Sequence, residues 1–211
     1  KGMNPPPLEI LDEPFKMFKT VLTDKVFLPA LKNTFIIWGV NFIPQILLAL
    51  VLAVWFTSTR RKIKGQGFFK VVLYMPNIIT AATIAILFSA FFGYPMGPVN
   101  DIFTTLGWAD KPIQFMQNKA VSRGVIIFIQ FWMWYGNTMI VLISGVLGIN
   151  PEIFEAAEVD GASRIQTFFL VTIPNLKTIL LYTLVTSLIG GLQMFDIPKL
   201  YLNGGPDNST L

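Results

Sequence analysis

Four stretches of this chain contain no Asp, Glu, Lys or Arg. They cover residues 35–56, 71–92, 124–147 and 178–195, so each is between 18 and 24 residues long. At about 1.5 Å per residue, helices of that length span roughly 27 to 36 Å, which matches a hydrocarbon core about 30 Å thick. We therefore predict an all-α fold, a polytopic bundle with four transmembrane spans.

The composition excludes most enzyme chemistry. The 211-residue chain contains no cysteine and no histidine, so it has no disulfide, thiol nucleophile, imidazole base, or ordinary zinc or haem site. We expect no catalytic residue, no metal site and no cofactor bound by this chain. The formal net charge of +4 does not indicate nucleic-acid binding, because the basic residues lie in loops next to apolar spans.

The loop between the first two spans, residues 57–70, sets the predicted orientation. It contains no acidic residue and five basic ones: Arg60, Arg61, Lys62, Lys64 and Lys70. Basic loops favour the cytoplasmic side of a membrane. Residues 148–177 are then cytoplasmic, and residues 93–123 and the tail from residue 203 face outward.

Residues 1–34 are predicted to form an extracytoplasmic or interfacial segment. Residues 8–33 mix apolar and charged side chains and include Pro14 and Pro29, which favours short helices over a span. The segment lacks the pattern of a secretory signal peptide.

The spans contain uncharged polar residues but no ionisable group at mid-span, which argues against proton coupling. Amides and hydroxyls beside aromatic rings suit a neutral, hydroxyl-rich solute. We predict a substrate pathway that includes Gln130, Trp132, Tyr135, Asn137 and Gln193. The same residue types also commonly join membrane helices to one another, and the spans hold further examples: Asn41, Gln45, Asn77, Thr80, Thr83, Thr138, Thr183, Thr186 and Ser187.

Two prolines within spans, Pro44 and Pro76, are expected to kink their helices because each lacks a backbone donor. Gly190 and Gly191 form another weak point, in the last span.

The loop of residues 150–174, called loop 150–174 below, predicts two short helices. Asn150 is a good N-cap, Pro151 suits the first helical position and Glu152 complements the helix dipole. The first helix should end near Asp160 and Gly161, and a second should run from residue 162 to about 171, before Pro174 ends it. Small residues at the bend would let another protein approach the backbone closely.

Loop 150–174 resembles the "EAA" loop in membrane subunits of bacterial binding-protein-dependent ABC importers. The resemblance rests on Glu155-Ala156-Ala157, then Asp160-Gly161-Ala162, then Ile173-Pro174. It implies a MetI-like permease core over residues 35–211, with the loop as a coupling helix seated in a groove of an ATPase subunit. The implied coupling residues are Glu155, Ala156, Ala157, Asp160, Gly161 and Ala162.

Other segments resemble the sugar-permease branch, the first-subunit type of maltose, lactose and glycerol-phosphate permeases. They are residues 31–34, residues 61–69, Met75-Pro76, Phe195-Asp196, Tyr201, residues 203–206 and Ser209-Thr210. This resemblance implies carbohydrate import across the bacterial cytoplasmic membrane. The implied partners are an ATPase dimer that carries ATP and Mg, a second permease subunit, an extracytoplasmic solute-binding protein and membrane lipid. The family core has six spans, so we expect a fragment that lacks the first and last core helices.

Two alternatives stay open at the level of sequence. The same loop would serve an importer of another solute, such as an amino acid or an oxyanion. A membrane scaffold subunit without a pathway is the second alternative.

Overall fold

The computed structural model describes residues 15–58, 64–206 and 210, and every regular element within them is helical. Two of these helices, α2 (Phe27–Thr57) and α6 (Lys119–Leu147), are long and apolar enough to cross a membrane. Two bent helix pairs, α3 with α4 and residues 164–175 with α10, raise the number to as many as four if each pair is one span. This confirms the predicted all-α membrane fold.

Helix α2 begins earlier than the predicted boundary at residue 35. A short helix, α1 (Lys16–Leu22), precedes it, and α2 then runs unbroken from Phe27 to Thr57. Pro29 is its third residue, where a missing backbone donor costs nothing because the first turn has no intrahelical acceptor for it. The prediction of only short helices before residue 34 is therefore wrong for residues 27–33. Pro44 lies inside α2 without ending it.

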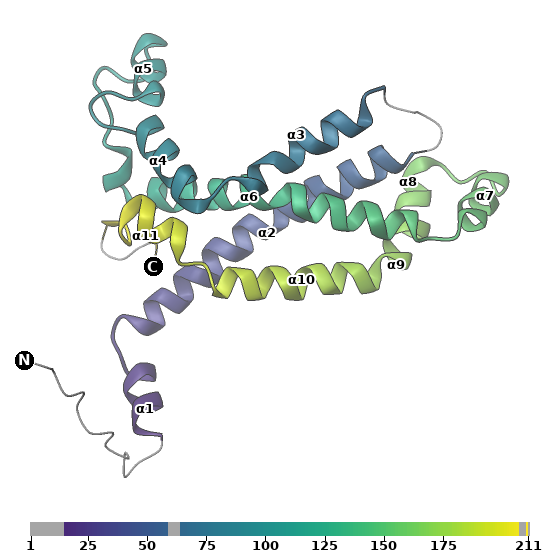
Figure 1. Cartoon of the computed structure of the whole chain (residues 1–211), viewed down its shortest axis with the longest axis horizontal. Helices are drawn as coiled ribbons and strands as arrows, with labels where there is room; N and C mark the ends of the chain where they lie inside the picture. Colours follow the sequence, from purple (N-terminus) through teal and green to yellow (C-terminus); the bar gives the residue numbers. More distant parts are fainter. Residues whose placement is uncertain (1–14, 59–63, 207–209, 211) are drawn as a thin grey trace, which may run out of the picture.

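Helix α6 is the central element of the bundle, with α2, α3 and α10 beside it (Figure 1). Its residues contribute to two apolar clusters. One includes Ala49, Ala53, Met139 and Leu142, and the other lies among residues of α2, α4, α6 and α11, including Ile126. Because lipid is as apolar as these side chains, close van der Waals packing holds the helices together more than burial from water does.

The predicted span 71–92 is not one helix. It consists of α3 (Gln66–Ile78) and α4 (Ala81–Phe91), which meet at an angle of 91°. Pro76 withholds a backbone donor two residues before α3 ends. The Thr80 side chain then accepts a hydrogen bond from the Thr83 backbone N–H at 3.3 Å, which caps the new helix. The expected kink at Pro76 is thus a sharp break.

The part after loop 150–174 differs from prediction in a similar way. The helical path continues through α8 (Arg164–Gln166), the π-helix η2 (Thr167–Thr172) and α9 (Ile173–Asn175), so it passes Pro174. It bends by 68° at Leu176, which is fully buried, before α10 (Lys177–Leu192). Pro174 is near the start of α9, where its missing donor is tolerated. The second helix is thus separate from the last span, as predicted, but it ends at Asn175, one residue beyond Pro174 and four beyond the predicted end at residue 171.

The two ends of the bundle carry different structures (Figure 1). At one end lie α5 (Pro98–Thr105), the 3₁₀ turn η1 (Phe115–Gln117) and α11 (Asp196–Leu202), which packs against α4. Buried Asn100 fixes the segment around α5, since its side chain donates to Gly93 O at 2.9 Å and accepts from Ile113 N–H at 2.7 Å. At the other end, α7 (Pro151–Val159) projects beyond the end of α2. Residues 93–118 and loop 150–174 thus lie at opposite ends, as predicted.

Helices α3 and α6 touch backbone to backbone at Gly136. A Cβ atom at this position would lie 2.3 Å from Leu73 O and 2.9 Å from the Tyr74 Cα. Only a residue without a side chain permits this approach, a common device of membrane helix pairs. Gly124, on the same helix, has open space around it instead.

We expect Gly136→Ala to destabilise the bundle, because the backbone of α3 must move to admit the methyl group. Overpacking of this kind costs about 1 to 3 kcal/mol, which should lower the thermal unfolding midpoint in detergent. Gly124→Ala is the matched control and should leave the midpoint unchanged or raise it slightly. Equal midpoints for the two variants would contradict the close contact.

Candidate functional site

The first helix of loop 150–174, α7, begins and ends at the residues that its sequence predicts. Asn150 is the N-cap of α7, and its side-chain oxygen accepts the Glu152 backbone N–H at 3.1 Å. Pro151 occupies the first helical position, and Asp160 is the C-cap. Gly161 follows with a φ of +75°, a conformation that suits glycine. The predicted start and end of this helix are both confirmed.

Helix α7 has no buried residue, and it projects from one end of the molecule (Figure 1). Of the six predicted coupling residues, four are exposed and two, Ala157 and Ala162, are half-buried. Val159 next to them is 87% exposed. The structure thus places the six together on a projecting surface of small and acidic side chains, open to a partner.

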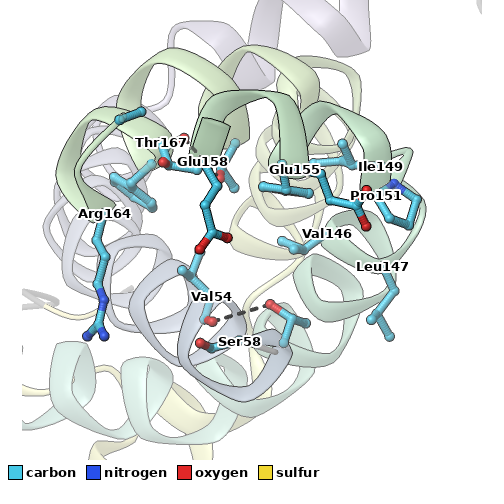
Figure 2. A pocket seen from close by; sticks show the side chains of 15 residues that line it. Val54, Ser58, Val146, Leu147, Ile149, Pro151, Glu155, Glu158, Arg164 and Thr167 are labelled. Carbon is cyan, nitrogen blue, oxygen red and sulfur yellow. Dashed lines mark hydrogen bonds between the residues drawn. The ribbon is translucent and has the colours of Figure 1, made fainter. Parts of the chain in front are cut away.

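A cavity of about 320 Å³ lies between this loop and the bundle, and its lining includes two of the six predicted coupling residues, Glu155 and Ala162 (Figure 2). Phe154 and Phe168 line it and also pack against the apolar cluster of α2 and α6. In Figure 2 the Glu158 side chain points into the cavity toward Val54, at the end of α2. Apolar contacts of Phe154 and Phe168 therefore attach the loop to the bundle beside this cavity.

Ser163 begins the second helix of the loop through a reciprocal capping box. The Gln166 backbone N–H donates to Ser163 Oγ at 3.3 Å, and the Ser163 backbone N–H donates to Gln166 Oε1 at 2.8 Å. This pairing of Ser with Gln three residues later is a recognisable sequence pattern. It fixes where the chain turns back toward the bundle after Gly161.

A second cavity, of about 190 Å³, lies between α2, α6 and α10. Its lining is rich in amides, hydroxyls and aromatic rings and includes no charged side chain. It comprises Trp38, Asn41, Gln45, Gln130, Trp134, Asn137, Thr138, Val141, Tyr182, Thr183, Thr186, Ser187, Gly190, Gly191 and Met194. We call it the polar cavity.

The structure brings together two of the five predicted pathway residues, Gln130 and Asn137, in the polar cavity. Trp132 instead packs against Phe88, with ring centroids 6.0 Å apart, and Tyr135 stacks on Phe131. Residues seven apart share a helix face, whereas residues two or five from Gln130 lie on another. Gln193, the C-cap of α10, is exposed and does not line the cavity.

The cavity also contains residues that were not assigned to the pathway from sequence. Trp38, Asn41 and Gln45 line it from α2, and Thr183, Thr186 and Ser187 from α10. Both sets recur at helical spacing, a signal that the sequence contains. Which of the polar faces meet cannot be read from spacing, because it depends on how the helices pack.

Side-chain hydrogen bonds cross the polar cavity at two levels. Gln45 Nε2 donates to Thr138 Oγ1 at 2.7 Å, and Trp38 Nε1 donates to Ser187 Oγ at 3.1 Å. Between them, Asn41 is buried and its Oδ1 has no hydrogen-bond partner among the described residues. An acceptor held this way is suited to a neutral solute that brings its own hydroxyl donors.

Within residues 15–58, 64–206 and 210, no three Asp or Glu side chains lie close enough together to hold a metal ion.

Comparison with known proteins places this geometry in a family. Residues 34–211 match the model of the binding-protein-dependent transport system inner membrane component. The chain is 34% identical over 190 residues to the lactose transport system permease protein LacF of Rhizobium radiobacter, covering 89% of this chain and 63% of LacF. It is 30% identical over 194 residues to the arabinooligosaccharides transport system permease protein AraP of Bacillus subtilis, covering 91% and 61%.

A solved structure agrees with these relatives. A chain of the bacterial alginate ABC transporter, in complex with an alginate pentasaccharide-bound periplasmic protein, matches with a TM-score of 0.75 and 26% identity. The match covers 93% of this chain and 66% of that one. The chain thus spans slightly under two thirds of the length of the first relatives. Because the family model covers most of the chain, this protein belongs to the binding-protein-dependent transport system inner membrane components.

Proposed function

We propose that this chain is the permease part of an ABC importer that carries a carbohydrate across the bacterial cytoplasmic membrane. The observation that carries the proposal is the projecting loop 150–174, in which Glu155, Ala156 and Gly161 are all exposed. Exposed small side chains on this helix allow a partner protein to approach its backbone closely, and we expect such a partner to cover it. That partner would be an ATPase dimer, which binds ATP and Mg and performs the hydrolysis.

The polar cavity supports a neutral solute. Its lining offers amide and hydroxyl groups for hydrogen bonds and three aromatic rings for the CH faces of a sugar. An amino acid or an oxyanion would bring a charge, and no charged side chain lines the cavity to meet it. The sugar names of LacF and AraP point the same way. A scaffold subunit without a pathway gives no account of the cavity.

Further partners follow from the surfaces of the membrane helices. Helix α10 has one buried residue, Thr183, so most of its surface is open to lipid and to a second permease subunit. With loop 150–174 on the cytoplasmic side, α1, α5 and α11 lie at the outer end of a multi-pass protein. An extracytoplasmic solute-binding protein would dock there.

The coupling surface can be tested with a single exposed residue. In the full-length subunit, Ala156→Glu should abolish or strongly reduce co-purification of the ATPase in detergent, because the larger charged side chain prevents close approach. Thr105→Glu, in the exposed helix α5 at the opposite end, is the matched control and should retain the ATPase. Retention by both variants would refute the coupling assignment.

Gly161 tests the shape of the turn. Gly161→Val should uncouple solute uptake from ATP hydrolysis, since a β-branched residue strongly disfavours a φ of +75°. Gly161→Asn should keep more uptake than Gly161→Val, because asparagine tolerates this conformation. The measurement is uptake of radiolabelled sugar together with ATPase activity in proteoliposomes. Normal coupling in the valine variant would contradict the prediction.

The polar cavity makes a prediction about affinity. Gln130→Leu and Asn137→Leu should each raise the half-saturating sugar concentration roughly fivefold, the cost of about one hydrogen bond. Gln193→Leu, outside the cavity, should change the half-saturating sugar concentration little.

The solute class can be tested separately. Uptake of lactose, arabinose oligomers, proline and sulfate in a strain lacking the gene would identify it. Loss of proline or sulfate uptake alone would replace the carbohydrate proposal with the other importer class, and no loss would favour the scaffold.

A further inference from the structure

Trp38 bridges two walls of the polar cavity. It projects from α2, and its indole N–H donates to Ser187 Oγ on α10 at 3.1 Å. This hydrogen bond joins α10 directly to α2. The hydroxyls of Thr183 and Thr186 bond instead to carbonyls of α10 itself.

The ring of Trp38 packs against Gly191 of α10. A Cβ atom at Gly191 would lie 2.5 Å from Trp38 Cδ1 and 2.8 Å from its Cγ, so the ring fills the space that a side chain would take. Phe42 stacks against the ring from α2, with centroids 5.5 Å apart. A Cβ atom at the adjacent Gly190, in contrast, would have no atom within 4 Å. The ring is thus wedged between its own helix and a glycine of α10.

Trp38 lies at the end of the cavity toward α5 and α11. Gln45, which bonds to Thr138 across the cavity, is seven residues further along α2, or about 10 Å at helical rise. Ser187 and Gly191 are likewise in the second half of α10, and Met194 follows just beyond the end of this helix. The Trp38 contact therefore lies in the part of the cavity nearest the end that the proposed function places outside the cell.

Helix α10, which contributes Ser187 and Gly191 to the Trp38 contact, is less buried in the bundle than α6. Thr183 is the only buried residue of α10, whereas α6 has many. The paired glycines at the end of α10 also leave that turn without side chains to hold it. A small outward movement of this turn would separate Gly191 from the Trp38 ring and break the hydrogen bond between Trp38 Nε1 and Ser187 Oγ.

We propose that Trp38 is the outer gate of the polar cavity, held closed by its packing against Gly191 and its hydrogen bond to Ser187. The inference rests on the proposed function for the direction of entry and for the solute. A hydroxylated solute passing this point can bond to Ser187 Oγ in place of the indole N–H, and its CH face can lie on the ring. Gate opening and solute entry would then use the same two groups.

The test measures access to the cavity from one side. Thr183→Cys introduces a small thiol on a buried, cavity-lining position of a chain that contains no cysteine. The full-length subunit, with any cysteine beyond residues 1–211 replaced by serine, is assembled with its partners in sealed membranes. The rate of labelling by a membrane-impermeant methanethiosulfonate reagent is measured from the outer and from the inner side.

Trp38→Ala should raise the outer labelling rate by more than about tenfold, because both the ring contact and the hydrogen bond are lost. Trp38→Phe keeps a ring and removes only the donor, so it should raise the rate by about two- to tenfold. Gly191→Ala should also raise it, by displacing the ring. Trp55→Ala is the matched control, since Trp55 is on the same helix, half-exposed and outside the cavity.

Three outcomes would overturn the gate: outer rates that do not depend on Trp38, an equal rise in the Trp55 control, or an equal rise from both sides. The last would show general loosening of the bundle. Sugar uptake by the parent protein separates the two proposals. Normal uptake with a labelling rate independent of Trp38 contradicts the gate alone, whereas no uptake with a rate that depends on Trp38 contradicts the proposed function alone.

Discussion

The contact of α6 with α2 and α3 supports everything else in this molecule. It brings backbone against backbone at Gly136, where a Cβ would lie 2.3 Å from Leu73 O. In a membrane this closeness matters more than apolar character, because lipid offers every leucine an equally apolar surrounding. With α6 fixed against α2 and α3, its remaining faces are positioned for the polar cavity and, at its end, for loop 150–174.

The polar cavity follows from how the membrane treats amides and hydroxyls. An unsatisfied polar group in hydrocarbon is costly, so these side chains turn toward one another. Gln45 and Thr138 satisfy each other, whereas Asn41 keeps an acceptor without a partner in the described residues. Structural pairing and the proposed solute binding therefore involve neighbouring residues of the same helix faces, which is why sequence alone left the two roles open.

Loop 150–174 is attached differently from the spans. Phe154 and Phe168 hold it to the apolar cluster at the ends of α2 and α6, and a cavity of about 320 Å³ lies beneath it. A π-helix and the bend at Leu176 lead from this loop into α10, the same helix that carries Ser187 and Gly191. The chain thus leads from the proposed ATPase surface, through the turn at Gly161 and the bend at Leu176, to the helix that carries the proposed outer gate.

The sequence by itself determined the elements whose causes are local. Charge-free stretches indicated the membrane helices, and Asn150, Pro151 and Gly161 set the start and end of α7, because capping and φ preferences act within a few residues. Tertiary structure decided the 91° break after Pro76 and the helical path through Pro174, since a proline can kink, end or begin a helix according to what packs around it. It also decided that Gln130 and Asn137 face the polar cavity while Trp132 and Tyr135 pack against rings. Helix rotation is fixed by contacts between residues far apart in the chain, and no local pattern encodes them.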